Sequence, residues 1–288
     1  MSIVTSKALV KRLIPPRSAS SRKGDNGTVL VAGGSRYYHG APTLASMAAL
    51  RTGADLVYTA VPRSITTEVR CHSPALIALP LPDDKLTVGS AGRLSAMLPK
   101  KCDSAAIGMG MSIARPEAIV ALVRKLREAE TRLLLDASAL VPEVLEEVKG
   151  TGCVVTPHAG EFKRLFGVSP GDGEDQRIKT ASEMARKHDV TILLKGPSDV
   201  ICDQSRVGLN RIHNSAMTVG GTGDVLSGVV AGLLAKKMSP FDAALAGAYV
   251  NGAAGNLAFA KVGLHMIATD LVDFMAEAFK PFDVIKSQ

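Results

Sequence analysis

The residues best suited to chemistry lie in one short stretch, NSAMTVGGTGD (214–224), which sets three glycines beside the carboxylate of Asp224. Glycine loses more backbone freedom on folding than any other residue, so Gly220, Gly221 and Gly223 indicate a special backbone requirement. Converging backbone N–H groups at the start of a helix can hold an anion such as a phosphate. The apolar run that follows, VLSGVVAGLLA, predicts such a helix.

A carboxylate beside a phosphate-binding loop is unfavourable unless it has a task, and Asp224 could take the proton from a hydroxyl group. The stretch would then support phosphoryl transfer to an alcohol, with the loop stabilising the developing charge. The alternative is that the glycines form a turn and Asp224 caps the helix, and the stretch alone leaves both interpretations open. It is neither a Walker A loop, because no G-K-[ST] follows, nor a dinucleotide fingerprint, because it follows a hairpin.

The elements that must position this stretch follow an alternating pattern. Short β-rich apolar runs predict strands at 28–34, 55–61, 75–81, 104–110, 132–137, 153–158 and 191–196, and helical patterns lie at 41–52, 115–129, 138–148 and 174–188. This alternation is typical of a mostly parallel sheet covered by helices on both faces. A hairpin is expected at 199–203 and 207–213, then helices at 223–237, 240–261 and 269–279. We expect a single domain over 1–288.

Composition excludes several classes of protein. Of the 288 residues, 46% are hydrophobic and 21% charged, as in a globular protein, and only 4% are aromatic, which argues against a nucleic-acid stacking surface. Six basic residues precede the first acidic residue, Asp25, so much of the net charge of +7 belongs to the basic N-terminal segment 1–23. We expect a helix and loop there, the alternative being a transit peptide. The scattered cysteines indicate a reducing compartment, and the stretch 243–260 is too weakly apolar to span a membrane. We therefore expect a cytoplasmic protein that does not bind membranes, and the low aromatic content predicts that it does not bind nucleic acid.

Several motifs together carry a resemblance to a known family. VGGTGD resembles the signature of ribokinase-like small-molecule kinases. The segments 24–57, TPHAGEFKRLFG (156–167), LKGPSDVI (194–201), NSAMTVGGTGDVLSG (214–228) and GLHMIATDLVD (263–273) follow the order seen in ADP/ATP-dependent NAD(P)H-hydrate dehydratases. The resemblance covers about residues 24–275. It implies a ribokinase-like three-layer αβα sandwich with a mostly parallel central sheet and a C-terminal antiparallel hairpin.

The resemblance also implies an activity. The enzyme would repair the S epimer of NAD(P)H hydrate: a nucleotide phosphorylates the C6 hydroxyl, and loss of phosphate restores NAD(P)H. Asp224 would be the base, and Gly221, Thr222 and Gly223 would hold the phosphoryl group. The nucleotide-binding positions would be Lys195, Gly196, Pro197, Ser198, Asp199, Asn214, Ser215, Ala216, Met217, Thr218, Val219, Gly220, Gly221, Thr222 and Gly223. Those for the hydrate would be Gly40, Ala41, Gly110, His158, Glu161, Arg164 and Asp224.

Further expectations concern cofactors and partners. Glu161 matches the acid of the kinases' N-x-x-E motif and would support Mg²⁺ through water, with ADP or ATP as donor. We expect a homo-oligomer. We also expect the protein to work together with a separate NAD(P)H-hydrate epimerase, because the chain has no room for an epimerase domain. Two departures stand out: the turn at Gly108 and Gly110 reads GMGMS instead of G-P-G-x-G, and Ser138 replaces the second acid of D-A-D after Asp136.

Two other functions remain open at this point. The first is a kinase of a small alcohol, resembling hydroxyethylthiazole or pyridoxal kinases, which would use the same base. The second is a nucleotide-binding sensor without catalysis, for which the acidity of Asp224 would be immaterial.

Overall fold

The computed structural model describes residues 2–98 and 101–287 and contains one ten-stranded sheet with the order β1-β11-β10-β9-β8-β7-β6-β3-β4-β5. Its strands are β1 (Ile3–Val4), β3 (Thr28–Ala32), β4 (Leu56–Pro62), β5 (Ile77–Leu81), β6 (Ser104–Ile107), β7 (Arg132–Leu135), β8 (Val154–Val155), β9 (Thr191–Leu194), β10 (Asp199–Cys202) and β11 (Val207–Asn210). All neighbours from β5 to β9 are parallel, whereas β10 is antiparallel to both β9 and β11. The predicted strands and hairpin are therefore confirmed.

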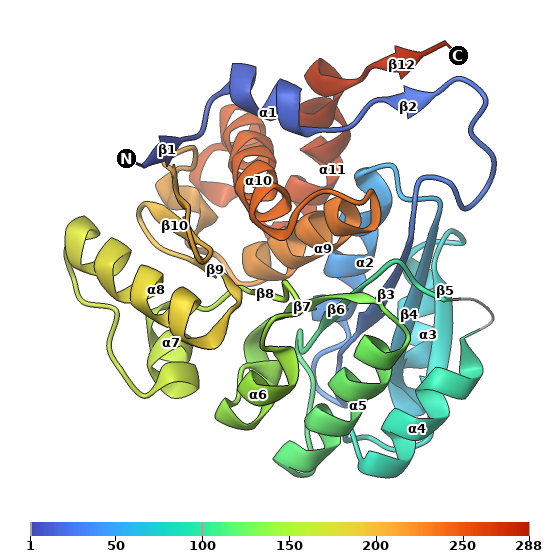
Figure 1. The fold of residues 1–288 in the computed structure, drawn as a ribbon. Coiled ribbons are helices and arrows are strands. Elements are labelled where there is room, and N and C mark those ends of the chain that lie inside the picture. The colour runs from blue at the N-terminus through green and yellow to red at the C-terminus, as the bar shows by residue number, and fades with distance from the viewer. Residues whose placement is uncertain (1, 99–100, 288) are drawn as a thin grey trace.

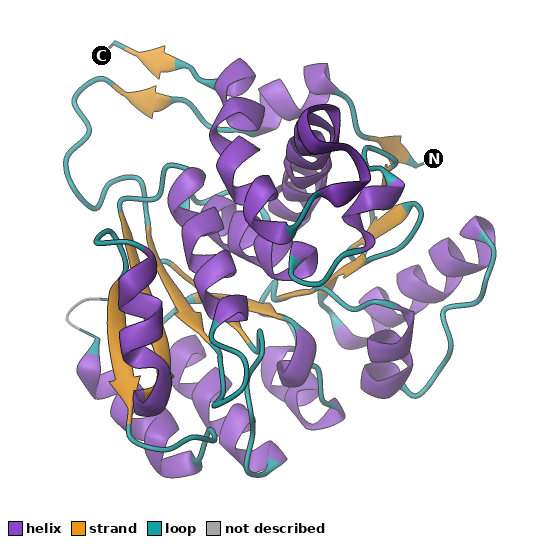
Figure 2. Cartoon of the chain, turned by 180° about the vertical axis from the view of Figure 1, so that it is seen from behind, coloured by secondary structure: helices purple, strands orange, loops and turns teal. Residues whose placement is uncertain are grey.

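Helices cover both faces of the sheet (Figures 1 and 2). They are α1 (Lys7–Leu13), α2 (Gly40–Arg51), α3 (Thr66–His72), α4 (Val88–Met97), α5 (Pro116–Glu128), α6 (Leu145–Val148), α7 (Ala159–Phe166), α8 (Glu174–His188), α9 (Thr222–Ala235), α10 (Pro240–Val262) and α11 (Ala268–Phe279). The side chains alternate along the strands: Val29 and Val31 face the layer with α2, α9, α10 and α11, whereas Leu30 and Ala32 face the layer with α4, α5 and α8. This is the predicted three-layer αβα fold.

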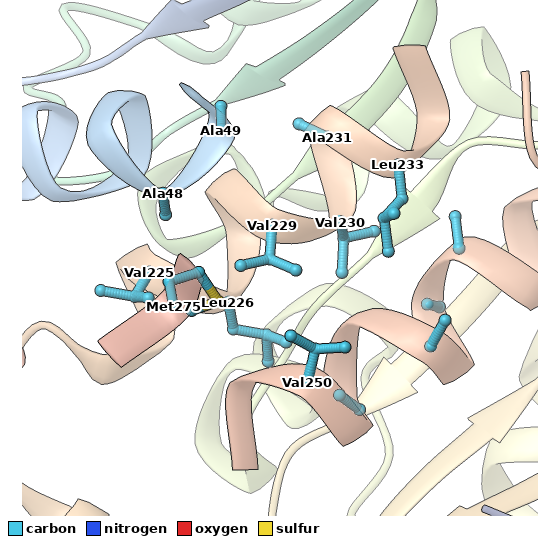
Figure 3. Packing of buried hydrophobic residues seen from close by; sticks show 14 of the residues in the cluster. Ala48, Ala49, Val225, Leu226, Val229, Val230, Ala231, Leu233, Val250 and Met275 are labelled. Atoms are coloured by element: carbon cyan, nitrogen blue, oxygen red, sulfur yellow. The ribbon is translucent and has the colours of Figure 1, made fainter. Parts of the chain in front are cut away.

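The helix α9 lies at the centre of one layer, where Figure 3 shows its Val225 and Val229 among residues of α2, α10 and α11. All of its residues from Val225 to Ala235 are buried. A Cβ on Gly228 would lie 2.0 Å from the carbonyl oxygen of Ala45, so glycine permits a close approach of α9 to α2. Tight packing on three sides fixes the position of the first turn of α9, which carries Asp224.

Some elements differ from the prediction. The helix expected at 138–148 is wrong: two 3₁₀ turns (Ala137–Ala139 and Pro142–Val144) precede a single turn of α-helix, α6. Pro142 lacks the N–H that a continuous helix would need, which explains the break. The N-terminal segment contains the expected helix, α1, but also β1, which pairs with β11, and β2 (Arg17–Ser18), which pairs with β12 (Ile285–Lys286). Among the described residues, no helix has the length and apolarity to cross a membrane.

Candidate active site

The first turn of α9 begins at a glycine in a left-handed backbone conformation. Gly221 has φ +98°, and a Cβ there would lie 2.8 Å from side-chain atoms of both Leu44 and Ala268. No side chain caps the helix, so its first N–H groups stay available to an anion. The hydroxyl of Thr222 donates to the carbonyls of Met217 and Val219 and holds the preceding loop against the helix. The geometry is that of an anion-binding helix start.

Asp224 lies in this turn, but its carboxylate makes no hydrogen bond to any described residue, so the capping interpretation does not hold. Burial raises the pKa of Asp224 to about 7, and the nearby Asp136 and Glu161 carboxylates act in the same direction, against the ammonium of Lys195. A carboxylate with a pKa near neutrality is poised to take up a proton. The structure thus gives Asp224 the electrostatics of a general base.

Lys195, at the end of β9, joins the acidic groups into one cluster. Its Nζ donates to Asp136 Oδ1 at 2.9 Å and lies 3.7 Å from Glu161 Oε2. Burial opposes the charged form, but the Asp136 and Glu161 carboxylates outweigh burial and raise the pKa of Lys195. A Cβ on Gly223 would lie 3.4 Å from Lys195 Nζ, so the ammonium faces the glycines of α9. Lys195 is therefore held within the cluster and does not project from the strand end into solvent.

Asp136 is the buried anchor of this cluster, with 2% of its surface exposed at the end of β7. Its second oxygen, Oδ2, accepts a hydrogen bond of 2.7 Å from Ser227, one turn beyond Asp224 in α9. Asp136 thereby connects β7, β9 and α9. The motif position of Asp136 is visible in the sequence, but no sequence pattern predicts its hydrogen bonds to Lys195 and Ser227.

His158 and Glu161 cap the start of α7 reciprocally. His158 Nδ1 accepts from the backbone N–H groups of Gly160 and Glu161, and Glu161 Oε2 accepts from the N–H of His158 at 2.9 Å. His158 remains largely exposed, so its ring can also meet a ligand, whereas Glu161 is buried beside Lys195. Capping thus orients both predicted side chains toward the cluster edge.

Arg164, predicted to bind substrate, forms hydrogen bonds with the protein backbone in this structure. Its guanidinium donates to the carbonyls of Leu140 and Ala137, at 3.1 and 2.7 Å. Ala137 has φ +49°, a conformation that an alanine rarely adopts. Arg164 therefore stabilises the strained turn that directly follows Asp136.

The two predicted nucleotide segments lie side by side. The ring of His213 contacts the carbonyl of Pro197, which joins the end of the hairpin to the loop 195–198. Asp199 closes that loop by accepting from the N–H of Gly196, and Asn214 caps the 3₁₀ turn Ser215–Thr218 by accepting from Ala216.

Arg177 of α8, which the sequence did not single out, fixes the same loop. It is buried and donates to the carbonyls of Leu194, Lys195 and Ser198 at 3.3 to 3.4 Å. A Cβ on Gly196 would lie 2.4 Å from its guanidinium, which explains the glycine. A basic residue within a surface helix pattern gives no signal of such a role.

The predicted substrate segments also meet. Gly110 has φ +61°, and a Cβ there would lie 3.0 Å from that of Ala41 and 2.8 Å from that of Tyr38. Gly40 begins α2 in open space beside them. A cavity of about 440 Å³ opens at Gly110 and extends to Ser138, two residues after Asp136.

Comparison with known proteins identifies the family. The profile of the NAD(P)H-hydrate dehydratase family matches residues 29–277. The chain belongs to this family. The ADP-dependent (S)-NAD(P)H-hydrate dehydratase of Nitrosopumilus maritimus is 52% identical over 96% of this chain and 97% of its own length. The corresponding protein of Cenarchaeum symbiosum is also 52% identical, over 95% and 96%.

Solved structures agree with this assignment to the dehydratase family. The ADP/ATP-dependent NAD(P)H-hydrate dehydratase of Bacillus subtilis, co-crystallised with ATP and Mg²⁺, superposes with a TM-score of 0.84 at 27% identity, covering 98% and 99% of the two chains. A hydroxyethylthiazole kinase of Pyrococcus horikoshii shares only the fold, at 15% identity and a TM-score of 0.64 over 95% and 94%. The predicted family and ribokinase-like fold are confirmed, and the dehydratase interpretation is favoured over a kinase.

Proposed function

We propose that this protein removes water from the S epimer of NAD(P)H hydrate and uses ADP as the phosphoryl donor. One observation of the structure carries the proposal: the Asp224 carboxylate, which accepts no hydrogen bond from the described residues and has a pKa of about 7, lies in the first turn of α9, a helix without a side-chain cap. The names of the two relatives with 52% identity support both the substrate and the choice of ADP.

In the first step, Asp224 takes the proton of the C6 hydroxyl as the hydroxyl oxygen attacks the terminal phosphorus of the nucleotide. The N–H groups after Gly221 and the ammonium of Lys195 face the place where negative charge develops. The products of this step are AMP and the phosphorylated hydrate.

In the second step, the C6–O bond breaks with its electron pair on phosphate, C5 gives up a proton to solvent water, and the C5–H electron pair forms the C5–C6 double bond of NAD(P)H. Inorganic phosphate is therefore a product. Lys195 favours phosphate as a leaving group because it stays charged: its pKa is raised by Asp136 and Glu161.

Mg²⁺ fits this site as an ion bound mainly by nucleotide phosphates and water. No group of three or more His, Cys, Asp or Glu side chains in residues 2–98 and 101–287 could hold a metal. Glu161, buried beside Lys195, would contact the hydrated ion through water. Bound there, the ion would neutralise phosphate charge.

The test is an assay with purified protein, hydrated NADH, Mg²⁺, and either ADP or ATP. Recovery of the reduced-nicotinamide absorbance with ADP, with one phosphate released per hydrate, is expected. Accumulation of a stable phosphoester would instead identify a kinase, and no recovery with either nucleotide would refute the proposal.

The remaining proposals concern partners and location. A bifunctional NAD(P)H-hydrate repair enzyme of Pyrobaculum aerophilum is 41% identical, and this chain covers 53% of it. We therefore propose that the protein works together with a separate epimerase. We also propose a cytoplasmic homo-oligomer; chromatography coupled to light scattering measures its size.

A further inference from the structure

Ser227 is the one polar residue in the buried part of α9, which runs from Val225 to Ala235. Its side chain is fully buried. Burying a hydroxyl group is unfavourable unless it forms a hydrogen bond, and serines inside helices commonly donate to a carbonyl of the preceding turn. Ser227 instead donates to Asp136 Oδ2 at 2.7 Å, across 91 positions of the sequence. The hydroxyl therefore has a specific partner outside its own helix.

Other contacts of α9 already fix this helix to its neighbours. Ser104 of β6 donates from its hydroxyl to the carbonyl of Ala231 at 2.7 Å, a bond that ends on the helix backbone. The close approach of Gly228 to the carbonyl of Ala45 holds α9 against α2. The bond of Ser227 differs from these contacts because it ends on a carboxylate of the candidate active site. Attachment of the helix therefore does not explain the choice of this partner.

The bond of Ser227 determines how the Asp136 carboxylate is oriented. The backbone of Asp136 is fixed, because its N–H donates to Ile107 at 3.0 Å and its carbonyl accepts from the N–H of Ala139 at 3.0 Å. Rotation of an aspartate carboxylate about its Cβ–Cγ bond is otherwise only weakly restricted. With Ser227 on Oδ2, the other oxygen, Oδ1, is directed at Lys195 Nζ, 2.9 Å away.

The orientation of Asp136 in turn sets the position of the Lys195 ammonium. Nζ lies between Asp136 Oδ1, at 2.9 Å, and Glu161 Oε2, at 3.7 Å, so Asp136 is the closer of its two anionic partners. On its other side, a Cβ on Gly223 would lie 3.4 Å from Nζ. An ammonium that followed a rotated Asp136 carboxylate would leave the start of α9. Stabilisation of developing charge requires groups that are in place before the reaction begins.

We propose that Ser227 is a positioning residue of the reaction: its hydroxyl orients Asp136, and Asp136 holds the Lys195 ammonium where charge develops on the transferred phosphoryl group. The inference rests on the proposed function, because it adds a supporting residue to that site. Ser227 follows Asp224 by three positions, so both lie on the same side of α9. One buried helix therefore carries both the base and the residue that positions the ammonium.

The first test compares two serines of α9 contacts by steady-state kinetics. Ser227→Ala should lower kcat about tenfold or more, which corresponds to about 1.4 kcal/mol of transition-state stabilisation. KM for ADP and for hydrated NADH should change less than about threefold, because the lost interaction belongs to the transition state. The matched control, Ser104→Ala, removes an equally buried hydroxyl with an equally short bond, remote from the Lys195 cluster. Its kcat should stay within about twofold of the parent.

A double-mutant cycle separates positioning from a merely structural role. If Ser227 acts through Lys195, Ser227→Ala should lower kcat less than about twofold in a Lys195→Met background. An equal loss of kcat in both backgrounds, or an unchanged kcat in Ser227→Ala, would overturn the proposal. Ser227→Cys provides a second variant if Ser227→Ala does not fold: it keeps a side chain of similar size, but a thiol is a weak donor, so the same loss of kcat is expected.

Failure of the proposed function would look different, because the unsubstituted protein would then turn over no hydrate. Nuclear magnetic resonance of protein with ¹³C-labelled lysine would still decide the role of Ser227. The Lys195 Cε signal, identified by its loss in Lys195→Met, should shift in Ser227→Ala and stay in place in Ser104→Ala. An unchanged signal in Ser227→Ala, or an equal shift in both serine variants, would contradict the positioning role.

Discussion

Two partly buried aspartates lie at opposite ends of the central strands and have opposite electrostatics. Asp55, just before β4, accepts from Arg17, from the N–H groups of Gly24 and Asn26, and from the Asn26 side chain, at 2.8 to 3.1 Å. Burial acts to raise the pKa of Asp55, but these hydrogen bonds and the Arg17 charge outweigh it and lower the pKa. Asp224 has no such donors, and burial with neighbouring carboxylates raises its pKa to about 7.

The comparison separates structural from chemical use of the same side chain. A carboxylate with four donors is stabilised as an anion and holds loops together. A carboxylate without donors, next to an uncapped helix, stays reactive at a cost in stability. Asp224 lies at the carboxyl ends of the strands, where ligands bind in open α/β sheets, whereas Asp55 lies at the amino end of β4. The positions of the two aspartates therefore agree with their different electrostatics.

The largest expected effect is on catalysis at Asp224. Asp224→Asn should lower kcat by about 10²–10⁴, because the amide cannot accept the hydroxyl proton. Steady-state recovery of reduced nicotinamide measures this effect. Nucleotide binding should persist, as measured by calorimetry with ADP, and wild-type turnover in the variant would exclude Asp224 as the base.

At high pH, Asp224→Asn should also be more stable than the parent protein. Because the folded pKa of about 7 lies above the ordinary 3.8, the folded state holds the proton more tightly, and stability falls as pH rises from about 4 to 7. At about 1.4 kcal/mol per pKa unit, Asp224→Asn should be more stable than the parent by up to about 4 kcal/mol above pH 7, and nearly equal at pH 4. Urea unfolding at the two pH values measures the difference.

Asp55→Asn should give the reverse pattern. Loss of the carboxylate leaves donors of Arg17, Gly24 and Asn26 poorly matched, so unfolding free energy should fall by about 1–3 kcal/mol at pH 7. The turnover number should change less than about twofold, because Asp55 lies at the amino end of β4. A large loss of kcat in a folded Asp55→Asn protein would contradict the division between the two ends.

The charges around Asp224 provide a finer test through the pH profile. The acidic limb of kcat/KM should reach its midpoint near pH 7, where Asp224 loses its proton. Asp136→Asn removes a negative neighbour and should shift this limb to lower pH, whereas Lys195→Met removes a positive neighbour and should shift it to higher pH. Shifts in the same direction for both variants would show that another group sets the limb.

More of the fold than of the candidate site could be predicted from the sequence. Strand runs and the motif around Asp224 are local patterns, so the parallel sheet, the hairpin and the family could be predicted. The contacts of Asp136 with Lys195 and Ser227 join residues 59 and 91 positions apart, which no local pattern records. The break at Pro142 was missed because the helical periodicity of 138–148 outweighed a single proline.

Within the glycine loop, alanine substitutions at three neighbouring positions should differ in their effect on stability, and two of them give the smallest effects expected. Gly221→Ala should destabilise the fold by about 1–3 kcal/mol, because φ is +98° and the Cβ would meet Leu44 and Ala268 at 2.8 Å. Gly223→Ala should leave stability within about 0.5 kcal/mol, since its Cβ would meet only Lys195 Nζ at 3.4 Å. The added methyl should still narrow the phosphate space and raise KM for ADP.

Gly220→Ala is the matched control, because a Cβ there meets no atom within 4 Å and the residue has no positive φ. Its unfolding free energy should stay within about 0.5 kcal/mol of the parent. Equal destabilisation of all three variants in urea would mean that the loop tolerates no side chain anywhere. Destabilisation of Gly221→Ala alone would instead show that backbone strain is confined to the helix start, where we propose that the helix N–H groups hold the phosphate and Asp224 takes the hydroxyl proton.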